Sequence, residues 1–217
     1  MYKSKIELHN IDCLPFMKQC EDNQFDLAIV DPPYGIGIDK AMNANKGKQG
    51  FKQYKATDWD SNTPTQEYFN ELFRISKNQI IWGANYMIDK IKKPSQGWLI
   101  WNKVQRDFTM SDAEIAWSSF DRTIRCFDLS RGGAMGCNNK TGGKLHPTQK
   151  PVKLYKWILS NYAKEGDKIL DTHLGSGSIA VACDDLGFDL TAFEIDKDYF
   201  NKANKRIDNA RRQQTLF

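Results

Sequence analysis

Residues 168–187 have the sequence KILDTHLGSGSIAVACDDLG, which predicts a strand, a glycine-containing loop and a helix in direct succession. The strand ends in Asp171, and Gly175 and Gly177 allow the loop backbone to turn tightly and approach a ligand closely. The helix is expected to stop at Gly187. This unit is typical of an open α/β sheet that binds a ligand at the carboxyl ends of its strands.

The next predicted strand, residues 190–194, ends in a second acidic residue, Glu194. A carboxylate at this point can accept hydrogen bonds from both hydroxyls of a ribose. The loop lacks the full GxGxxG spacing, because residue 180 is Ala, and it lacks the lysine of a Walker motif. The C-terminal part of the chain therefore predicts a site for a nucleoside-containing cofactor.

A second motif stands at the end of another strand. Residues 25–30, FDLAIV, form a continuous apolar run but for Asp26 and predict a buried central strand. The run ends in Asp31-Pro32-Pro33-Tyr34, where two prolines make continuation of a strand or helix difficult. The loop that follows, roughly 25 residues long, is too long to be a simple connection.

The rest of the chain alternates strand-like and helix-like segments without an internal repeat, which predicts an α/β fold with a mostly parallel sheet of about seven strands. Further strands are expected at residues 6–9, 79–82, 98–101, 114–117 and 123–127, the last two joined by a turn. Helices are expected at residues 14–20, 65–77, 152–162 and 197–213. Tryptophans within the strand patterns are expected in the core, namely Trp82, Trp98, Trp101 and Trp117.

Composition favours a globular chain of one domain. It has 217 residues, of which 40% are hydrophobic and 27% charged. No apolar run approaches the roughly 18 residues of a membrane span, and the first residues show no secretory leader. The five cysteines contain no Cys-x-x-Cys pair, which argues against a zinc site and a disulfide scaffold. We therefore expect a cytoplasmic protein with no metal and no membrane partner.

The net charge of +4 is only mildly basic, but it is unevenly distributed. Two Gly- and Asn-rich stretches, about 35–58 and 131–145, contain many basic residues and few acidic ones. They predict loops that clamp a phosphate backbone and are poorly ordered without it, whereas solvated surface loops are the alternative. The lysines of the first stretch are Lys40, Lys46, Lys48, Lys52 and Lys55.

Several segments resemble motifs of the amino-methyltransferases of DNA, the N4/N6 family. Residues 31–34, DPPY, resemble the catalytic motif in its adenine form, and residues 146–151, HPTQKP, resemble the motif that precedes the helix leading into the cofactor strand. Residues 171–177 resemble the cofactor loop, residues 193–196 the ribose-binding strand end, and residues 9–14 a segment near the cofactor adenine. Their order is similar to the β-type arrangement, which implies a Rossmann-like S-adenosylmethionine-dependent methyltransferase fold with permuted motif order.

The resemblance implies a single methyltransferase domain, residues 1–217, with a small target-recognition insertion at about 106–145. It implies that Asp31 and Asp171 end neighbouring strands at the switch point of the sheet. The implied catalytic residues are Asp31, Pro32, Pro33 and Tyr34. The implied residues of the S-adenosyl-L-methionine site are Asp12, Cys13, His146, Thr148, Lys150, Asp171, His173, Gly175, Ser176, Gly177, Glu194 and Asp196.

Some of these residues have particular expected roles. Asp12 is expected beside the cofactor adenine, Lys150 near its carboxylate and Glu194 at its ribose. The loop departs from the family pattern, because Thr172 and His173 stand where the family usually has Pro and Phe. DNA is the implied partner, a homodimer is possible, and a place in restriction-modification is implied.

The implied chemistry explains why these residue types are needed. An adenine amino nitrogen is a poor nucleophile, and acceptors on the Asp31 carboxylate and the Pro32 carbonyl can aim its lone pair at the sulfonium methyl group. Tyr34 offers a ring on which the extruded base can stack. Phe or Trp in place of Tyr34 is therefore expected to keep much of the activity. Asn85 and Tyr86 follow a strand end and are candidates to line the pocket.

Four other functions fit part of the sequence. Methylation of cytosine at N4 is the nearest alternative, although the family form for cytosine usually begins with Ser rather than Asp31. An NPPY form acts on glutamine amides or RNA, and Asp31 and the motif order argue against it. A dinucleotide-dependent oxidoreductase leaves the DPPY segment unexplained, and a non-catalytic DNA-binding module needs no cofactor pocket.

Overall fold

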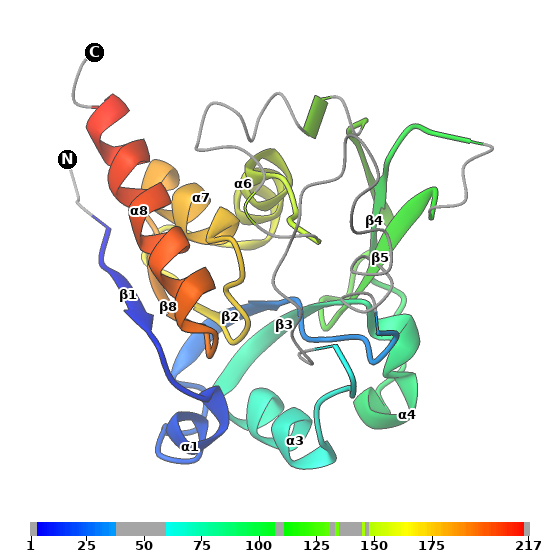
Figure 1. Ribbon diagram of the computed structural model, residues 1–217. Helices are drawn as coiled ribbons and strands as arrows, with labels where there is room; N and C mark the ends of the chain where they lie inside the picture. Colours follow the sequence, from blue (N-terminus) through cyan, green and yellow to red (C-terminus); the bar gives the residue numbers. More distant parts are fainter. Residues whose placement is uncertain are drawn as a thin grey trace.

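The computed structural model describes residues 4–37, 60–106, 111–130, 133–134, 145 and 148–214. Within these ranges the chain forms one eight-stranded sheet with helices against both of its faces (Figure 1). Most elements of regular structure lie within a residue or two of their predicted ranges because their hydrophobic patterns are strong. The α/β fold with a mostly parallel sheet is confirmed.

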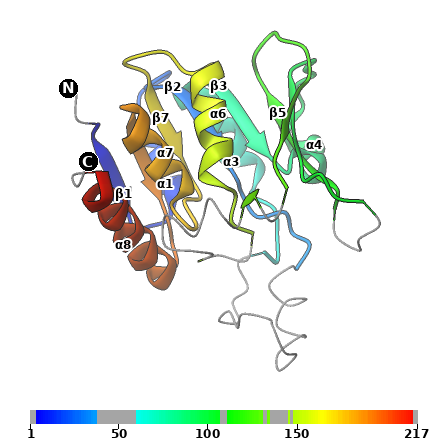
Figure 2. The ribbon, with the colours of Figure 1, turned by 90° about the horizontal axis from the view of Figure 1, so that it is seen from above.

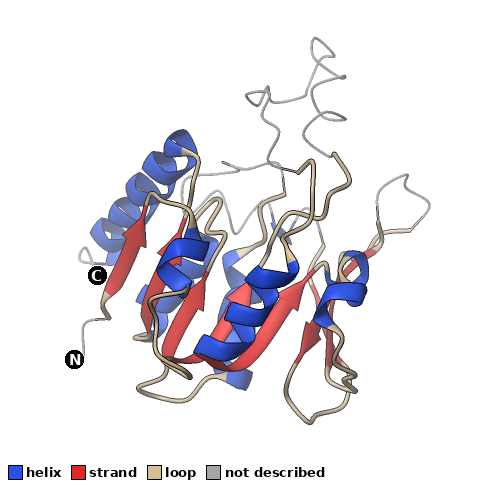
Figure 3. Cartoon of the chain, turned by 90° about the horizontal axis from the view of Figure 1, so that it is seen from below, coloured by secondary structure: helices blue, strands red, loops and turns tan. Residues whose placement is uncertain are grey.

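The strands follow the order β1-β8-β7-β2-β3-β5-β4-β6 across the sheet. Only β5 runs against its neighbours β3 and β4, and β6 pairs with β4 in parallel. Most arrows in Figure 3 therefore point the same way. The strands are β1 (Ile6–His9), β2 (Phe25–Val30), β3 (Ser76–Trp82), β4 (Trp98–Asn102), β5 (Ala113–Ser118), β6 (Arg125–Asp128), β7 (Lys168–Asp171) and β8 (Asp189–Phe193).

Helices cover the two faces as separate layers (Figure 2). One face packs against α6 (Val152–Tyr162), α7 (Ser178–Leu186) and α8 (Lys197–Gln214), and the other against α1 (Cys13–Met17) and α3 (Gln66–Ile75). Alternation along β2 supplies both cores, because Leu27 and Ile29 face the first layer while Ala28 and Val30 face the second. Trp82, Trp101 and Trp117 are buried in these cores and Trp98 packs against the second, as predicted.

Three details differ from the sequence-based expectations. The helix expected at 65–77 ends at Ile75, because Ser76 already pairs with Phe25 as the first residue of β3. The strands β5 and β6, which follow one another in the chain, are not neighbours, because β4 lies between them. A 3-10 turn η1 (Ala84–Tyr86) and the short helix α4 (Ile88–Ile91) follow β3 and were not expected.

The strands β7 and β2 are neighbours at the centre of the parallel part of the sheet. From β7 the chain crosses to β8 on one side, whereas from β2 it crosses to β3 on the other. This is the topological switch point, where α/β sheets leave a crevice beyond the carboxyl ends of the strands. Asp31 directly follows β2 and Asp171 ends β7, so the predicted adjacency of these strand ends is confirmed.

None of the helices in the described part of the chain combines the length and apolar character needed to cross a membrane. The basic stretches predicted to clamp DNA, about 35–58 and 131–145, lie almost entirely outside the described residues.

Candidate active site

Asp31 stands in the turn that follows β2, and each oxygen of its carboxylate has a side-chain partner. The Tyr34 hydroxyl donates to Asp31 Oδ1 at 2.7 Å, and Lys150 Nζ lies 2.5 Å from Asp31 Oδ2. Lys150 also donates to the Tyr34 hydroxyl at 3.1 Å. These contacts close a triangle that fixes the direction of the Asp31 carboxylate.

Two further charged side chains, Glu114 and Lys103, extend this group from the side of Lys150. Glu114 of β5 lies 3.2 Å from Lys150 Nζ and 2.9 Å from Lys103 Nζ, and the side chain of Lys150 is only 1% exposed. Burial lowers the pKa of Lys150, but the carboxylates of Asp31 and Glu114 outweigh it and hold this pKa above its usual value. Burial raises the pKa of Glu114, and the two lysines outweigh that effect and hold it below its usual value. Acids and lysines therefore alternate along a row of four charged side chains.

The backbone of the DPPY turn is held by a buried acid from beyond the following loop. Asp60 is 1% exposed, and its Oδ1 accepts from the backbone N–H of Tyr34 at 2.7 Å and of Gly35 at 3.0 Å. Its carbonyl accepts from the N–H of Gly37 at 3.0 Å. Asp60 thus supplies acceptors for the backbone N–H groups of Tyr34 and Gly35, whereas the two prolines have no backbone N–H to donate.

The ring of Tyr34 lies against the end of β3. Gly83 has φ +65°, and a Cβ atom there would stand 2.0 Å from Cε1 of Tyr34, so only glycine leaves room for the ring. The other neighbour is Tyr86, whose ring is stacked on that of Tyr34 with centroids 5.2 Å apart. Tyr86 is 44% exposed, so this aromatic pair stands at the surface of the site.

The glycine loop after β7 is bound to the end of β8 through Glu194. Its two carboxylate oxygens accept from the N–H of Gly175 and of Asp196, each at 2.8 Å. Burial raises the pKa of Glu194 to about 7 despite these two hydrogen bonds. A carboxylate has roughly four acceptor positions, so Glu194 retains capacity for further donors.

Asp171 is buried beneath the same loop. Its Oδ1 accepts from the N–H of His173 at 3.0 Å. Burial raises the pKa of Asp171 to about 8, the His173 hydrogen bond opposes this, and the charges of Asp31 and Glu194 raise it further. Burial also lowers the pKa of His173 to about 4, which keeps its imidazole neutral. The ring packs edge-on against Tyr68, with centroids 5.5 Å apart.

The remaining predicted cofactor residues come from the start of α1 and from the segment ahead of α6. Asp12 caps α1 by accepting from the N–H of Leu14, and its charge acts on His173. Burial raises the pKa of the Cys13 thiol to about 12, with Asp12 and Asp171 adding to the effect. Thr148 is half-buried ahead of α6. His146 lies outside the described residues.

Two predicted residues have contacts other than those expected. Lys150 was expected near the cofactor carboxylate, but in this structure its ammonium group is bound to Asp31 and Glu114. Asp196 accepts from the N–H groups of Asp198 and Tyr199, so its carboxylate caps the start of α8.

The residues beyond β7 and β8 fit a nucleoside-containing cofactor. Gly177 has φ +74°, and a Cβ there would stand 3.1 Å from Cβ of Ala203, so the loop turns where a side chain has no room. The carboxylate of Glu194 retains acceptor capacity beside its two N–H donors, which suits ribose hydroxyls. Asp31 directly follows β2 and Asp171 ends β7, so these neighbouring strands bring the two carboxylates to one edge of the sheet.

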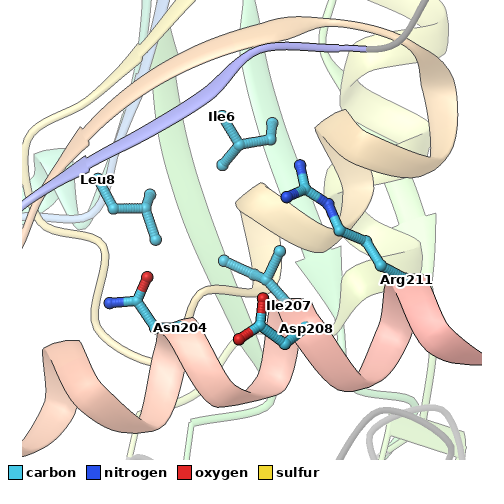
Figure 4. A pocket seen from close by; sticks show the side chains of 6 residues that line it. All are labelled: Ile6, Leu8, Asn204, Ile207, Asp208 and Arg211. Carbon is cyan, nitrogen blue, oxygen red and sulfur yellow. The ribbon is translucent and has the colours of Figure 1, made fainter.

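A cavity of about 240 Å³ lies elsewhere, between β1 and α8 (Figure 4). It contains none of the residues described above, and its lining consists of Ile6, Leu8, Asn204, Ile207, Asp208 and Arg211. Within the described ranges, the His, Cys, Asp and Glu side chains form no group of three or more that could hold a metal ion.

Comparison with known proteins finds similarity to DNA methyltransferases. Residues 132–205 match the N6_N4_Mtase family model, described as DNA methylase. The chain is 27% identical to the Type II methyltransferase M.HpaI of Haemophilus parainfluenzae, over 89% of this chain and 71% of that protein. It is also 27% identical to the Type II methyltransferase M2.DpnII of Streptococcus pneumoniae, over 95% of this chain and 91% of that protein.

Solved structures share the fold. The M1.HpyAVI–SAM complex superposes with a TM-score of 0.57 at 19% identity, covering 93% of this chain and 99% of that one. The PvuII DNA methyltransferase, described as cytosine-N4-specific, superposes with a TM-score of 0.59 at 12% identity, covering 97% and 93%. The family model and the two curated relatives support an N4/N6 DNA methyltransferase.

Sequence reasoning missed several residues that support the site. Glu114 gave no signal beyond its place in a strand, and Asp60 stands in a segment of no recognisable motif. Gly83 could have been noticed, because a glycine directly after a predicted strand often marks a close approach of another group.

Proposed function

We propose that this protein transfers a methyl group from S-adenosylmethionine to the N6 amino group of an adenine extruded from DNA. The proposal rests above all on the Asp31 carboxylate, held in a fixed direction directly beside the strand end that carries the cofactor loop. S-adenosylmethionine supplies an electrophilic methyl group when it is bound. Asp171, Gly175, Gly177 and Glu194 are the residues that would hold it.

The catalytic residues bind and orient the base. Asp31 accepts a hydrogen bond from the amino group and the Pro32 carbonyl accepts a second, which turns the nitrogen lone pair out of conjugation with the ring. Because Lys150 and Tyr34 already hold the carboxylate, little reorganisation is needed when the base arrives. The Tyr34 ring provides the stacking surface, which is worth about 1–3 kcal/mol per base.

Adenine is proposed over cytosine because the motif begins with Asp31, the acceptor form that resembles adenine enzymes. The direct test is to methylate unmodified DNA with the purified protein and S-adenosylmethionine, digest it and separate the nucleosides by mass spectrometry. N6-methyl-2′-deoxyadenosine is the expected product. N4-methylcytosine would assign the same site to cytosine, and the absence of both would refute the proposed reaction.

The target-recognition role of residues 106–145 and a homodimer remain predictions. Sequencing methylated DNA for its modified positions would show whether a defined word is recognised. Sedimentation of the protein with and without DNA would give its oligomeric state.

A further inference from the structure

The C-terminal helix α8 places a buried cation, Arg206, against the cofactor loop. Arg206 is 1% exposed, and its Nη1 donates to the carbonyl of Ser176 at 2.9 Å and to its hydroxyl at 3.2 Å. The same nitrogen donates to the hydroxyl of Ser178 at 2.9 Å. The two serines flank Gly177, so Arg206 binds the loop on both sides of its tightest turn.

A second contact ties the same turn to α8. Gly177 lies so close to Ala203 that a Cβ on the glycine would stand 3.1 Å from Cβ of the alanine. Ala203 precedes Arg206 by almost one helical turn, so both residues face the loop from one side of α8. From the opposite side, Glu194 accepts the N–H of Gly175 at 2.8 Å. The loop is therefore held between the end of β8 and the side of α8.

Burying an arginine to attach a helix costs free energy, because its charge is removed from water. Burial lowers the pKa of Arg206 to about 10, which reports the cost of removing its charge from water. Apolar side chains of similar volume often replace buried charges with no loss of stability. The hydrogen bonds of Arg206 to the loop give a reason for a guanidinium at this position, because an apolar side chain would leave the Ser176 carbonyl without this donor.

We propose that Arg206 is a positioning residue for the cofactor, which acts by holding the loop from Gly175 to Ser178 in its binding conformation. The inference rests on the proposed function, since it assigns the loop to S-adenosylmethionine. Without Arg206 the loop samples other conformations, and binding must restore the ordered one. Cofactor affinity then falls, whereas the Asp31 side of the site is unaffected.

The test compares Arg206→Met with Arg211→Met. Arg211 lies on the same helix and donates to Asp184 Oδ1 at 2.7 and 3.0 Å, so its loss also removes hydrogen bonds between α8 and α7. Calorimetric titration with S-adenosylmethionine should show a Kd at least tenfold higher for Arg206→Met and within twofold of wild type for Arg211→Met. Arg206→Lys, which keeps the charge and one donor group, should recover part of the affinity. At saturating cofactor, the kcat of Arg206→Met should stay within about threefold of wild type.

Hydrogen exchange on the cofactor-free proteins gives a readout that needs no cofactor. Amides from Leu174 to Ser178 should exchange faster in Arg206→Met than in Arg211→Met. If Arg206→Met does not fold, Ser178→Ala removes one of the acceptors, and it should raise the Kd about threefold. A wild-type protein that binds no S-adenosylmethionine would refute the proposed function. Normal wild-type binding with equal affinity and exchange in both methionine variants, or an unchanged Kd in Ser178→Ala, would refute the role of Arg206 alone.

Discussion

The acidic residues in the two halves of the site have different kinds of partner. At the end of β2, Asp31 and Glu114 each lie beside buried or half-buried lysines, and the pKa of Glu114 is held below its usual value. Beyond β7 and β8, Asp171 and Glu194 accept backbone N–H groups, and burial raises their pKa values to about 8 and about 7. In the catalytic half, lysines already neutralise the carboxylates. In the cofactor half, the carboxylates can accept further hydrogen bonds, and such donors would stabilise them.

The halves also differ in how the chain builds them. The cofactor loop and the groups that hold it come mainly from one stretch, β7 to α8, although Asp12 and Cys13 come from the start of α1. The catalytic half brings together residues from four distant segments, namely Asp31, Asp60, Glu114 and Lys150. A preorganised carboxylate therefore depends on long-range contacts, and substitutions in the two halves should change different kinetic constants.

The largest effect is expected from Asp31→Ala. It removes the acceptor for the amino group and leaves the cofactor loop untouched, so kcat should fall by about 10²–10³-fold, as on loss of one preorganised electrostatic partner. Methyl transfer from labelled cofactor measures kcat, and calorimetry should show an almost unchanged cofactor Kd. Near-normal methylation by this variant would refute the assignment of Asp31.

Lys150→Met tests which half Lys150 serves. If it orients Asp31, loss of its charge-assisted hydrogen bonds should lower kcat by about 10–100-fold and leave the cofactor Kd within twofold. The matched control is Lys103→Met, which breaks only the outer contact to Glu114 and should lower kcat less than threefold. A raised cofactor Kd in Lys150→Met would instead support the sequence-based expectation that Lys150 meets the cofactor carboxylate. Melting curves should accompany both variants, because Lys150 is buried.

Glu194→Ala should affect the cofactor half alone. Removal of the expected ribose acceptor should raise the S-adenosylmethionine Kd about tenfold, the size of one charge-assisted hydrogen bond, with kcat at saturation little changed. Titration calorimetry measures the affinity. An unchanged Kd would show that the ribose lies elsewhere.

Tyr34→Phe separates stacking from orientation of the carboxylate. Sequence alone suggests that Phe keeps much of the activity, because it retains the ring. Since the Tyr34 hydroxyl donates to the Asp31 carboxylate at 2.7 Å, kcat should nevertheless fall about tenfold, the lower end of the range for a hydrogen bond to a charged group. Base extrusion, followed by the fluorescence of 2-aminopurine at the target, should be unchanged. Wild-type kcat in this variant would show that Lys150 alone is sufficient to orient Asp31.

The smallest effect expected is on the pH dependence of stability. Folding raises the pKa of Glu194 to about 7 and of Asp171 to about 8. At pH values between the usual and the raised pKa of each group, the folded chain therefore binds more protons than the unfolded chain. These groups stabilise the cofactor-free protein in acid, and that contribution is lost as pH rises toward about 8. Melting temperatures of wild type and Glu194→Gln should therefore converge or cross over this range, with the steeper decline in wild type. Parallel curves would contradict the raised pKa of Glu194.

The sequence predicted much of the fold because its main signals are local. The apolar runs at 6–9, 25–30 and 168–171 are strands with those bounds, and the helix at 152–162 has its predicted ends. It did not predict the position of β4 between β5 and β6, because pairing order depends on which edges remain free once the central strands have paired. It also expected about seven strands, whereas all eight strand segments that it named, β6 among them, pair into one sheet.

For the site, the sequence alone determined the motifs and the order in which they follow the strands. Asp31, Tyr34, Asp171 and Glu194 could be named because proline, glycine and strand-end positions restrict the backbone locally. Only the tertiary structure decided that Lys150 lies between Asp31 and Glu114 and that Arg206 lies beneath the cofactor loop. These partners are separated by tens of residues from the groups they hold. The sequence around a charged residue does not indicate which distant group it will contact in the folded chain.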